Sequence, residues 1–193
     1  MTMQQDIVDP ARVFEPELSW SAIIAGATVA LATSLFLTLL AAGFGYTFAF
    51  GGLAYRGSLA AFSPIFGAGA IAVQVVAGGF GGYVAGRLRH QWLSAHLDEA
   101  HFRDTAHGLL AWALSTVVGV VLAATVLIPY AEQLAAPVAP MALTADEALR
   151  ASNIAMQAAF FTAFGMLLSA FVAAVAGRIG GLRNEEMHAK GRA

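Results

Sequence analysis

The chain has 193 residues, of which 59 % are hydrophobic and 11 % are charged, and its formal net charge is −2. A typical soluble domain carries about 25 % charged residues, so this composition indicates a surface that faces lipid. The net charge provides no basic field for nucleic acid. The lack of cysteine excludes disulfides, thiolate metal sites, iron–sulfur clusters and cysteine nucleophiles.

Four segments without Asp, Glu, Lys or Arg are long enough to cross a bilayer, whose apolar core of about 30 Å needs about 20 helical residues. They cover roughly residues 20–48, 64–86, 106–130 and 152–177. Lipid cannot satisfy a free backbone amide, and the alternating pattern of a membrane β-barrel is missing, so helices are predicted. The fold class we predict is all-α, a polytopic protein with four transmembrane helices. A very apolar soluble bundle is the alternative.

Residues able to cap a helix precede each segment. They are Ser19, Ser63, Asp104 and Thr144. Pro64 suits the first helical position, where no amide hydrogen is needed. The sequence from Thr144 to Glu147 fits a capping box, which predicts that the fourth helix begins before the membrane. Pro137 and Pro140 keep the preceding loop non-helical.

The basic residues predict the orientation of the four helices. Eight of them fall on one side of the membrane: Arg12, Arg87, Arg89, Arg103, Arg178, Arg183, Lys190 and Arg192. The other side has only Arg56 and Arg150. Cytoplasmic loops carry the excess of Lys and Arg, so both termini are expected in the cytoplasm. The predicted parts are a cytoplasmic N-tail (1–18), a transmembrane domain (19–178) and a cytoplasmic C-tail (179–193).

A short internal repeat favours two helical hairpins. Val84–Leu88 reads VAGRL at the end of the second segment, and Val175–Ile179 reads VAGRI at the end of the fourth. Parallel repeats of this kind occur in transporters. The same pentad also serves simply to end a helix at the inner surface, with Arg reaching the headgroups. Both interpretations stay open.

Small residues recur every four positions in three of the segments, which places them on one face of each helix. The predicted packing residues are Gly26, Ala30, Ser34, Gly78, Gly82, Gly86, Gly165, Ser169 and Gly177. Lipid gives helices no hydrophobic drive to associate, so close backbone approach must hold them together. The pattern predicts tight helix packing, either within one chain or between chains.

Gln74 is the candidate polar contact inside the membrane. It precedes Arg87 by 13 residues, which is ~20 Å along a helix and places it near the midplane. Its amide either joins two helices or contacts a transported substrate. No segment contains Asp, Glu or Lys, which argues against a proton-coupled pump.

The stretch from His90 to His107 is the one place with clustered coordinating groups. Its imidazoles and carboxylates could bind zinc or another divalent metal, but no HExxH or similar spacing appears. A solvated loop that caps helices is the simpler interpretation. No nucleophile elbow, Walker loop or dinucleotide motif is present either. We therefore expect no metal, no cofactor and no enzymatic activity.

Three stretches carry a resemblance to a known group: Ser19–Gly26, Gly81–Arg87 and His107–Ala113, with Asp98–Gly108 leading into the last. Together they resemble four-helix inner-membrane proteins of proteobacteria of unknown function, a group sometimes labelled PhnA-like. The resemblance covers roughly Ser19 to Arg178. It implies the bacterial inner membrane and the same fold, but no activity.

The resemblance directs attention to a candidate polar cluster of Arg87, Arg103, Asp104 and His107 at the inner surface. In this hypothesis Asp104 pairs with Arg87 or Arg103, and His107 responds to pH. Ordinary anchoring of the loop is the alternative.

Three functions remain at this point. The first is a non-enzymatic helix-packing component that assembles with copies of itself or as an accessory subunit of a membrane complex. The second is a small transporter or channel built from two hairpins, with Gln74 lining its path. The third is a metal sensor at His96–His107. The expected partners are the lipid bilayer and membrane-protein subunits, not nucleic acid.

Overall fold

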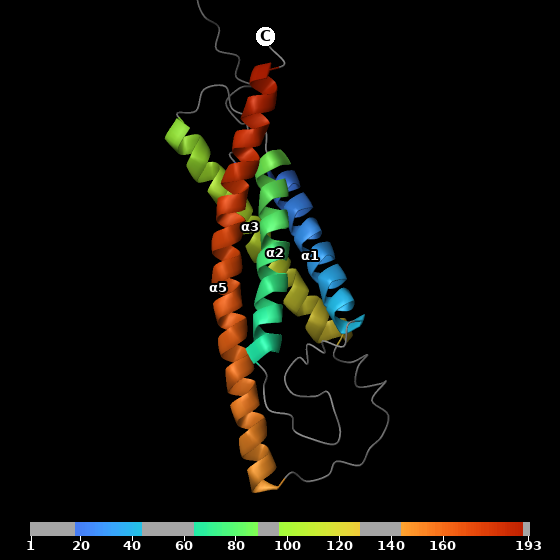
Figure 1. Ribbon diagram of the computed structural model, residues 1–193. Helices are drawn as coiled ribbons and strands as arrows, with labels where there is room; N and C mark the ends of the chain where they lie inside the picture. The colour runs from blue at the N-terminus through green and yellow to red at the C-terminus, as the bar shows by residue number, and fades with distance from the viewer. Residues whose placement is uncertain (1–17, 44–63, 89–96, 128–143, 191–193) are drawn as a thin grey trace, which may run out of the picture.

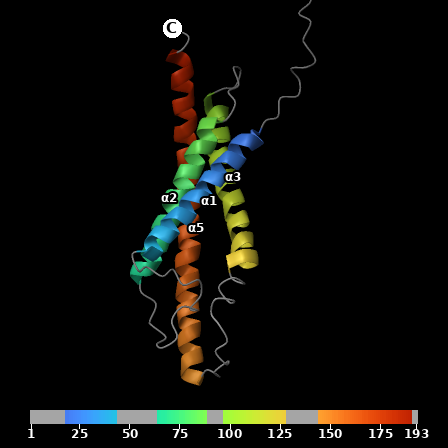
Figure 2. The same cartoon turned by 90° about the vertical axis from the view of Figure 1, so that its right-hand side faces the viewer.

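The computed structural model describes residues 18–43, 64–88, 97–127 and 144–190, and these are almost entirely helical. The helices are α1 (Trp20–Gly43), α2 (Pro64–Leu88), α3 (Leu97–Leu122, continued by a π-helical turn at Ala123–Leu127) and α5 (Ala145–Lys190). Successive helices run in opposite directions (Figures 1 and 2). All four are long and apolar enough to cross a membrane. The predicted all-α class with four such helices is confirmed.

Two helices begin where the sequence predicts, and two extend further. α1 starts at Trp20 and α2 at Pro64, but α3 starts at Leu97 and α5 covers Ala145–Lys190. The prediction that Asp104 caps the third helix is therefore wrong, because Asp104 lies inside α3. The apolar segments mark only the part of each helix that lipid covers, and a helix continues into the polar region where charged residues are tolerated. Residues 44–48 and 128–130, Ser63, Pro137 and Pro140 lie outside the described residues.

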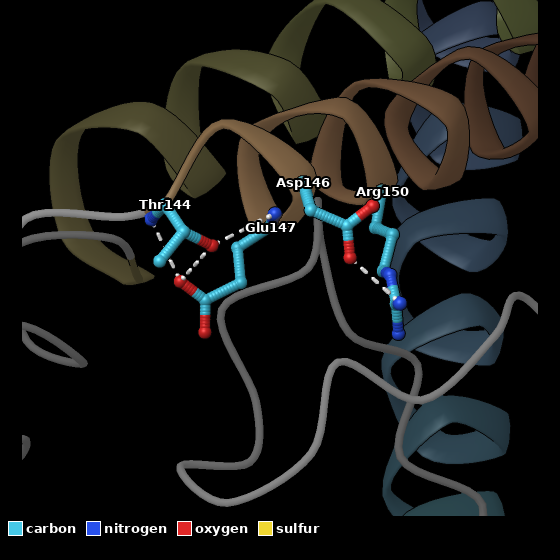
Figure 3. Close-up of polar contacts among 4 residues, drawn as sticks. All are labelled: Thr144, Asp146, Glu147 and Arg150. Atoms are coloured by element: carbon cyan, nitrogen blue, oxygen red, sulfur yellow. Dashed lines mark hydrogen bonds and ion pairs between the residues drawn. The ribbon is translucent and has the colours of Figure 1, made fainter.

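The capping box at the start of α5 is confirmed (Figure 3). The Thr144 amide and hydroxyl both donate to Oε2 of Glu147, at 2.8 and 2.9 Å. The Glu147 amide donates in return to the Thr144 hydroxyl oxygen at 3.3 Å. One turn on, Arg150 pairs with Asp146 at 2.7 Å on the exposed face of the helix. These charged groups stand before the uncharged stretch 151–177, so this end of α5 lies outside the membrane-spanning part.

The helices pack with small side chains inside and large ones outside. Among the residues that the structure describes, the buried hydrophobic ones other than Ile23 are all alanines: Ala22, Ala27, Ala30, Ala77, Ala85, Ala111 and Ala173. Large side chains are exposed along the same helices, among them Phe36, Phe80, Phe160, Phe164, Leu167 and Phe171. Lipid tails are as apolar as leucine, so outward-facing Phe and Leu lose nothing in a bilayer. The arrangement fits a protein surrounded by lipid.

The most extensive interface joins α2 to α5. Gly78, Gly82 and Gly86 of α2 lie against Ser169, Ala173 and Gly177 of α5, one pair per turn. A methyl group on Gly82 or Gly86 would overlap the backbone carbonyl of the facing residue. The two backbones are therefore in direct contact along this line, which we call the α2–α5 seam.

α1 packs on a different face of α2 by the same means. A methyl group on Gly26 would come within 2.5 Å of the Gly81 carbonyl oxygen and 2.8 Å of the Ala85 Cβ. Gly81 in turn lies against Ala30. α3 contacts α1, α2 and α5, whereas α1 and α5 are not neighbours in the described part of the chain. α2 and α3 thus hold the two outer helices together.

Gln74 lies on the α2–α5 seam. Its backbone carbonyl accepts a hydrogen bond from the Ser169 hydroxyl at 2.7 Å. Its side chain is directed toward α5, because a methyl group on Gly165 would come within 3.0 Å of the Gln74 Oε1. The residue that the sequence places near the midplane is therefore half-buried between two helices.

We expect Gly82→Ala to lower the free energy of unfolding by about 1–3 kcal/mol, because the added methyl group must push the α5 backbone away. Gly119→Ala is the matched control, since its methyl group would meet Leu31 Cδ2 at an ordinary 3.4 Å. The control should be neutral or more stable by up to about 1 kcal/mol, because alanine favours helix. Reversible unfolding in mixed micelles measures both. Equal changes in the free energy of unfolding for the two substitutions would contradict the direct contact between Gly82 and the α5 backbone.

The capping box generates a pH prediction. Hydrogen bonds from the Thr144 backbone and then its side chain, with a smaller effect of Arg150, hold the pKa of Glu147 below its ordinary value of 4.5. A lowered carboxyl pKa in the folded state contributes stability above the ordinary pKa, and this is lost as the pH falls through the lowered one. Amide exchange in the first turn of α5 should therefore accelerate in acid, relative to intrinsic rates.

Thr144→Ala should accelerate exchange in the first turn of α5 at neutral pH and return the Glu147 pKa toward 4.5. Asp146→Asn is the control, because its exposed ion pair with Arg150 contributes little. A carboxyl carbon titration of Glu147 by NMR gives the pKa directly. A pKa of Glu147 at its ordinary value in the protein with the native Thr144 would show that the capping box does not form.

Candidate functional site

Polar groups gather at one end of the helix bundle, where α1 begins, α2 ends, and α3 crosses α5 after its first turns (Figures 1 and 2). Arg87 lies in the last turn of α2, and Arg103, Asp104 and His107 lie on the first half of α3. We call these four residues the end cluster. The structure thus places all four predicted residues on two helices that contact each other.

Asp104 is the unusual member of the end cluster. It is 1 % exposed, and it and Ile23 are the largest fully buried side chains in the described residues. Its carboxylate lies against Gly181 of α5, where a methyl group would overlap both carboxylate oxygens. Its backbone carbonyl lies against Gly177. Two glycines on one face of α5 therefore make the space for a carboxylate at this depth.

Arg87 folds back over its own helix. Its Nη1 donates to the Tyr83 hydroxyl oxygen at 2.7 Å, and its Cζ lies 5.8 Å from the centre of the Tyr83 ring. The backbone here is covered by α5, because a methyl group on Gly180 would overlap the Tyr83 carbonyl and come within 2.9 Å of the Arg87 nitrogen. The ion pair of Asp104 with Arg87 or Arg103 stays a prediction.

His107 of α3 bonds to backbone groups through both ring nitrogens, one on its own helix and one at the residue before α1. The Ser19 backbone amide donates to Nε2 at 3.0 Å, and Nδ1 lies 2.7 Å from the Arg103 carbonyl oxygen. A carbonyl oxygen can only accept, so Nδ1 carries the hydrogen, whereas Nε2 is bare because an amide can only donate. His107 is 2 % exposed. The bond to Ser19 thus ties the start of α1 to α3.

Sequence reasoning missed several glycines around the end cluster. Gly181 continues the spacing of four through Gly165, Ser169, Ala173 and Gly177, but it lies beyond the uncharged segment 152–177 to which the predicted pattern belongs. Gly108 also contacts α5, since a methyl group there would overlap the Ala173 carbonyl. Extending the pattern past the membrane border would have found Gly181, whereas Gly108 stands in no such series.

The structure places the predicted packing residues as follows. Gly26 and Ala30 face α2, Gly78, Gly82 and Gly86 face α5, and Gly165, Ser169 and Gly177 face α2, with Gly177 also against α3. Ser34 differs, because its hydroxyl donates to the Leu31 carbonyl of its own helix at 2.9 Å. Whether packing also joins separate chains stays open.

Among the described residues, no group of three His, Asp or Glu side chains is close enough together to hold a metal ion. His90 and His96 lie outside the described residues. His101 and His107 lie on α3, the latter with both nitrogens bonded to backbone groups.

Comparison with protein families, with curated proteins and with solved structures finds no match to this chain. The resemblance to the PhnA-like group stays a prediction. Inferences about function therefore rest on the geometry of the α2–α5 seam and of the end cluster.

A double-mutant cycle tests the contact between Gly181 and Asp104. Gly181→Ala should lower the free energy of unfolding by about 1–3 kcal/mol, because its methyl group must displace a buried carboxylate. In an Asp104→Ala background the same substitution should cost at least about 1 kcal/mol less, since the space is then free. Leu182→Ala, at a position 38 % exposed, is the control. Additive effects would rule out the contact.

Proposed function

We propose that this chain is a non-enzymatic helix-packing component of the bacterial inner membrane, which assembles with copies of itself or as an accessory subunit of a membrane complex. The observation that carries the proposal is the α2–α5 seam. Gly82 and Gly86 bring the backbones of the two helices into direct contact, with no side chain between them. Such a contact favours a fixed unit over one whose helices separate during each cycle of work.

The seam also bears on the predicted hairpins. If α1 pairs with α2 and α3 with α5, the most extensive interface lies between the two hairpins rather than within them. A transporter made of two rocking hairpins would have to open this interface in every cycle. Direct backbone contacts gain dispersion energy only at close range, so opening them forfeits most of that energy at once.

The orientation we propose rests on the basic residues. Arg87, Arg178 and Arg183 lie near the ends of α2 and α5, and Arg103 lies near the start of α3, which is the same end of the bundle (Figure 1). Arg150 lies at the opposite end. An excess of Arg at one end favours its placement at the cytoplasmic surface, with both termini in the cytoplasm.

The outer surface favours assembly with other membrane proteins. α5 exposes Phe160, Phe164, Leu167 and Phe171 along one side, with 57–72 % of each residue accessible. Their spacing of three and four places them on one helix face. In a bilayer such a face is covered by lipid or by another apolar helix, and aromatic side chains give a second helix large contact areas.

The alternative function is a small transporter or channel, and Gln74 is the residue that favours it. Its side chain lies at the seam beside Gly165, and Ser169 bonds its backbone carbonyl. These are polar groups at membrane depth on facing helices. Ion flux into proteoliposomes that is lost in Gln74→Leu, while the size of the particle is unchanged, would favour the path over the packing role.

Native mass measurement in lipid nanodiscs tests the proposal. The chain has a mass of 20.0 kDa, and we expect a particle that contains two or more copies, or one copy with a co-purifying membrane protein. Changing Phe164 and Phe171 to Ala should reduce the assembled fraction, whereas changing Phe36 to Ala on α1 should not. A particle that is strictly one copy with no companion would overturn the proposal.

A further inference from the structure

We propose that His107 is a proton-operated latch that holds the beginning of α1 on α3 when the ring is neutral and releases it when the ring is protonated. The contact joins residues 88 positions apart in the chain. It goes beyond the packing role proposed above, because it gives one end of the bundle a response to pH.

The two hydrogen bonds from His107 to backbone groups fit a neutral ring with its hydrogen on Nδ1. The Ser19 amide donates its hydrogen to Nε2, and Nδ1 donates its own hydrogen to the Arg103 carbonyl oxygen. An imidazolium carries hydrogen on both nitrogens and has no acceptor site. Protonation would therefore set two donors against each other at 3.0 Å. The Arg103 contact survives protonation, so the Ser19 contact is the one that breaks.

The Ser19 amide has no replacement within its own helix. The first four amides of a helix lack a backbone acceptor, and Ser19 stands directly before α1. The acceptor of this amide is the imidazole of His107. The Ser19 hydroxyl lies 3.3 Å from the Ser21 hydroxyl. Ser19 is only half-buried, so once released its amide bonds to water, and the start of α1 loses its hydrogen bond to α3.

Among the described side chains, three of the four helices bring titratable groups to this end of the bundle. α1 has no titratable side chain. α2 brings Tyr83 and Arg87, and α3 brings Arg103 and the buried Asp104 one turn before the histidine, with His101 nearer the surface. α5 brings Arg178 and Arg183, both exposed. Asp104 favours an imidazolium and the arginines oppose it. These charges set the pH of release, whereas the direction is fixed by the bonds: closed above that pH and open below it.

The chain has no cysteine, so two introduced cysteines can carry spin labels without interference. Leu18, two residues before α1, and Phe102, on α3, are both exposed, and each is next in the chain to a residue that bonds to His107. In the full-length protein in nanodiscs, the distance between labels at these positions should be short and narrowly distributed at about pH 8. It should lengthen and broaden by about pH 5, across the range in which histidine changes charge.

Two variants separate the latch from general acid effects. His107→Gln keeps an acceptor for the Ser19 amide but cannot take up a proton, so its distance should stay short at both pH values. His107→Leu has no acceptor and should give the broad distribution at both. If His107→Leu fails to fold, the comparison of the unchanged protein with His107→Gln still decides. The proposal would be overturned if the distance between the labels in the protein with the native His107 were the same at both pH values. It would also be overturned if His107→Gln showed the same broadening in acid.

Discussion

The direct contact between the α2 and α5 backbones is the constraint on which the rest of the structure depends. Lipid does not drive helices together as water does, so their association needs atoms in van der Waals contact over a long interface. Gly82 facing Ala173 and Gly86 facing Gly177 provide that contact with no side chain between. Once these two helices are joined, α3 braces both, and α1 docks through Gly26 and Ala30 on a remaining face of α2.

The same close approach creates the end cluster. Gly177, Gly180 and Gly181 continue the smooth face of α5 beyond the uncharged segment, so α5 stays close to α2 and α3 where charged residues begin. Asp104 and His107 are consequently buried inside the protein, in the part of the bundle where charged residues begin. Polar groups in such a place need partners inside the protein, because an unsatisfied one is costly. The exact bonds of His107 follow from this requirement.

The sequence predicts the parts of the fold that depend on local chemistry. Uncharged length identifies four helices, Trp20 and Pro64 mark two starts, and Thr144 with Glu147 forms the predicted capping box. It does not predict where helices end once they leave lipid, because water and headgroups tolerate helix and coil alike. Nor does the sequence predict the bond from Ser19 to His107. That bond depends on how α1 and α3 are placed in space, and these helices are separated in the sequence by α2. The cap predicted at Asp104 is wrong because α3 begins before the uncharged segment, at Leu97.

The length of α5 has a mechanical consequence. Its 46 residues span ~69 Å, more than twice the apolar thickness of a bilayer of about 30 Å. One unbroken hydrogen-bonded rod therefore runs from Glu147 on one side of the membrane to Gly181 beside Asp104 on the other (Figure 1). The same helix also carries one side of the seam, where Ala173 and Gly177 contact the α2 backbone. The capping box and the Gly181 contact are thus two ends of one continuous element, which is anchored to α2 between them.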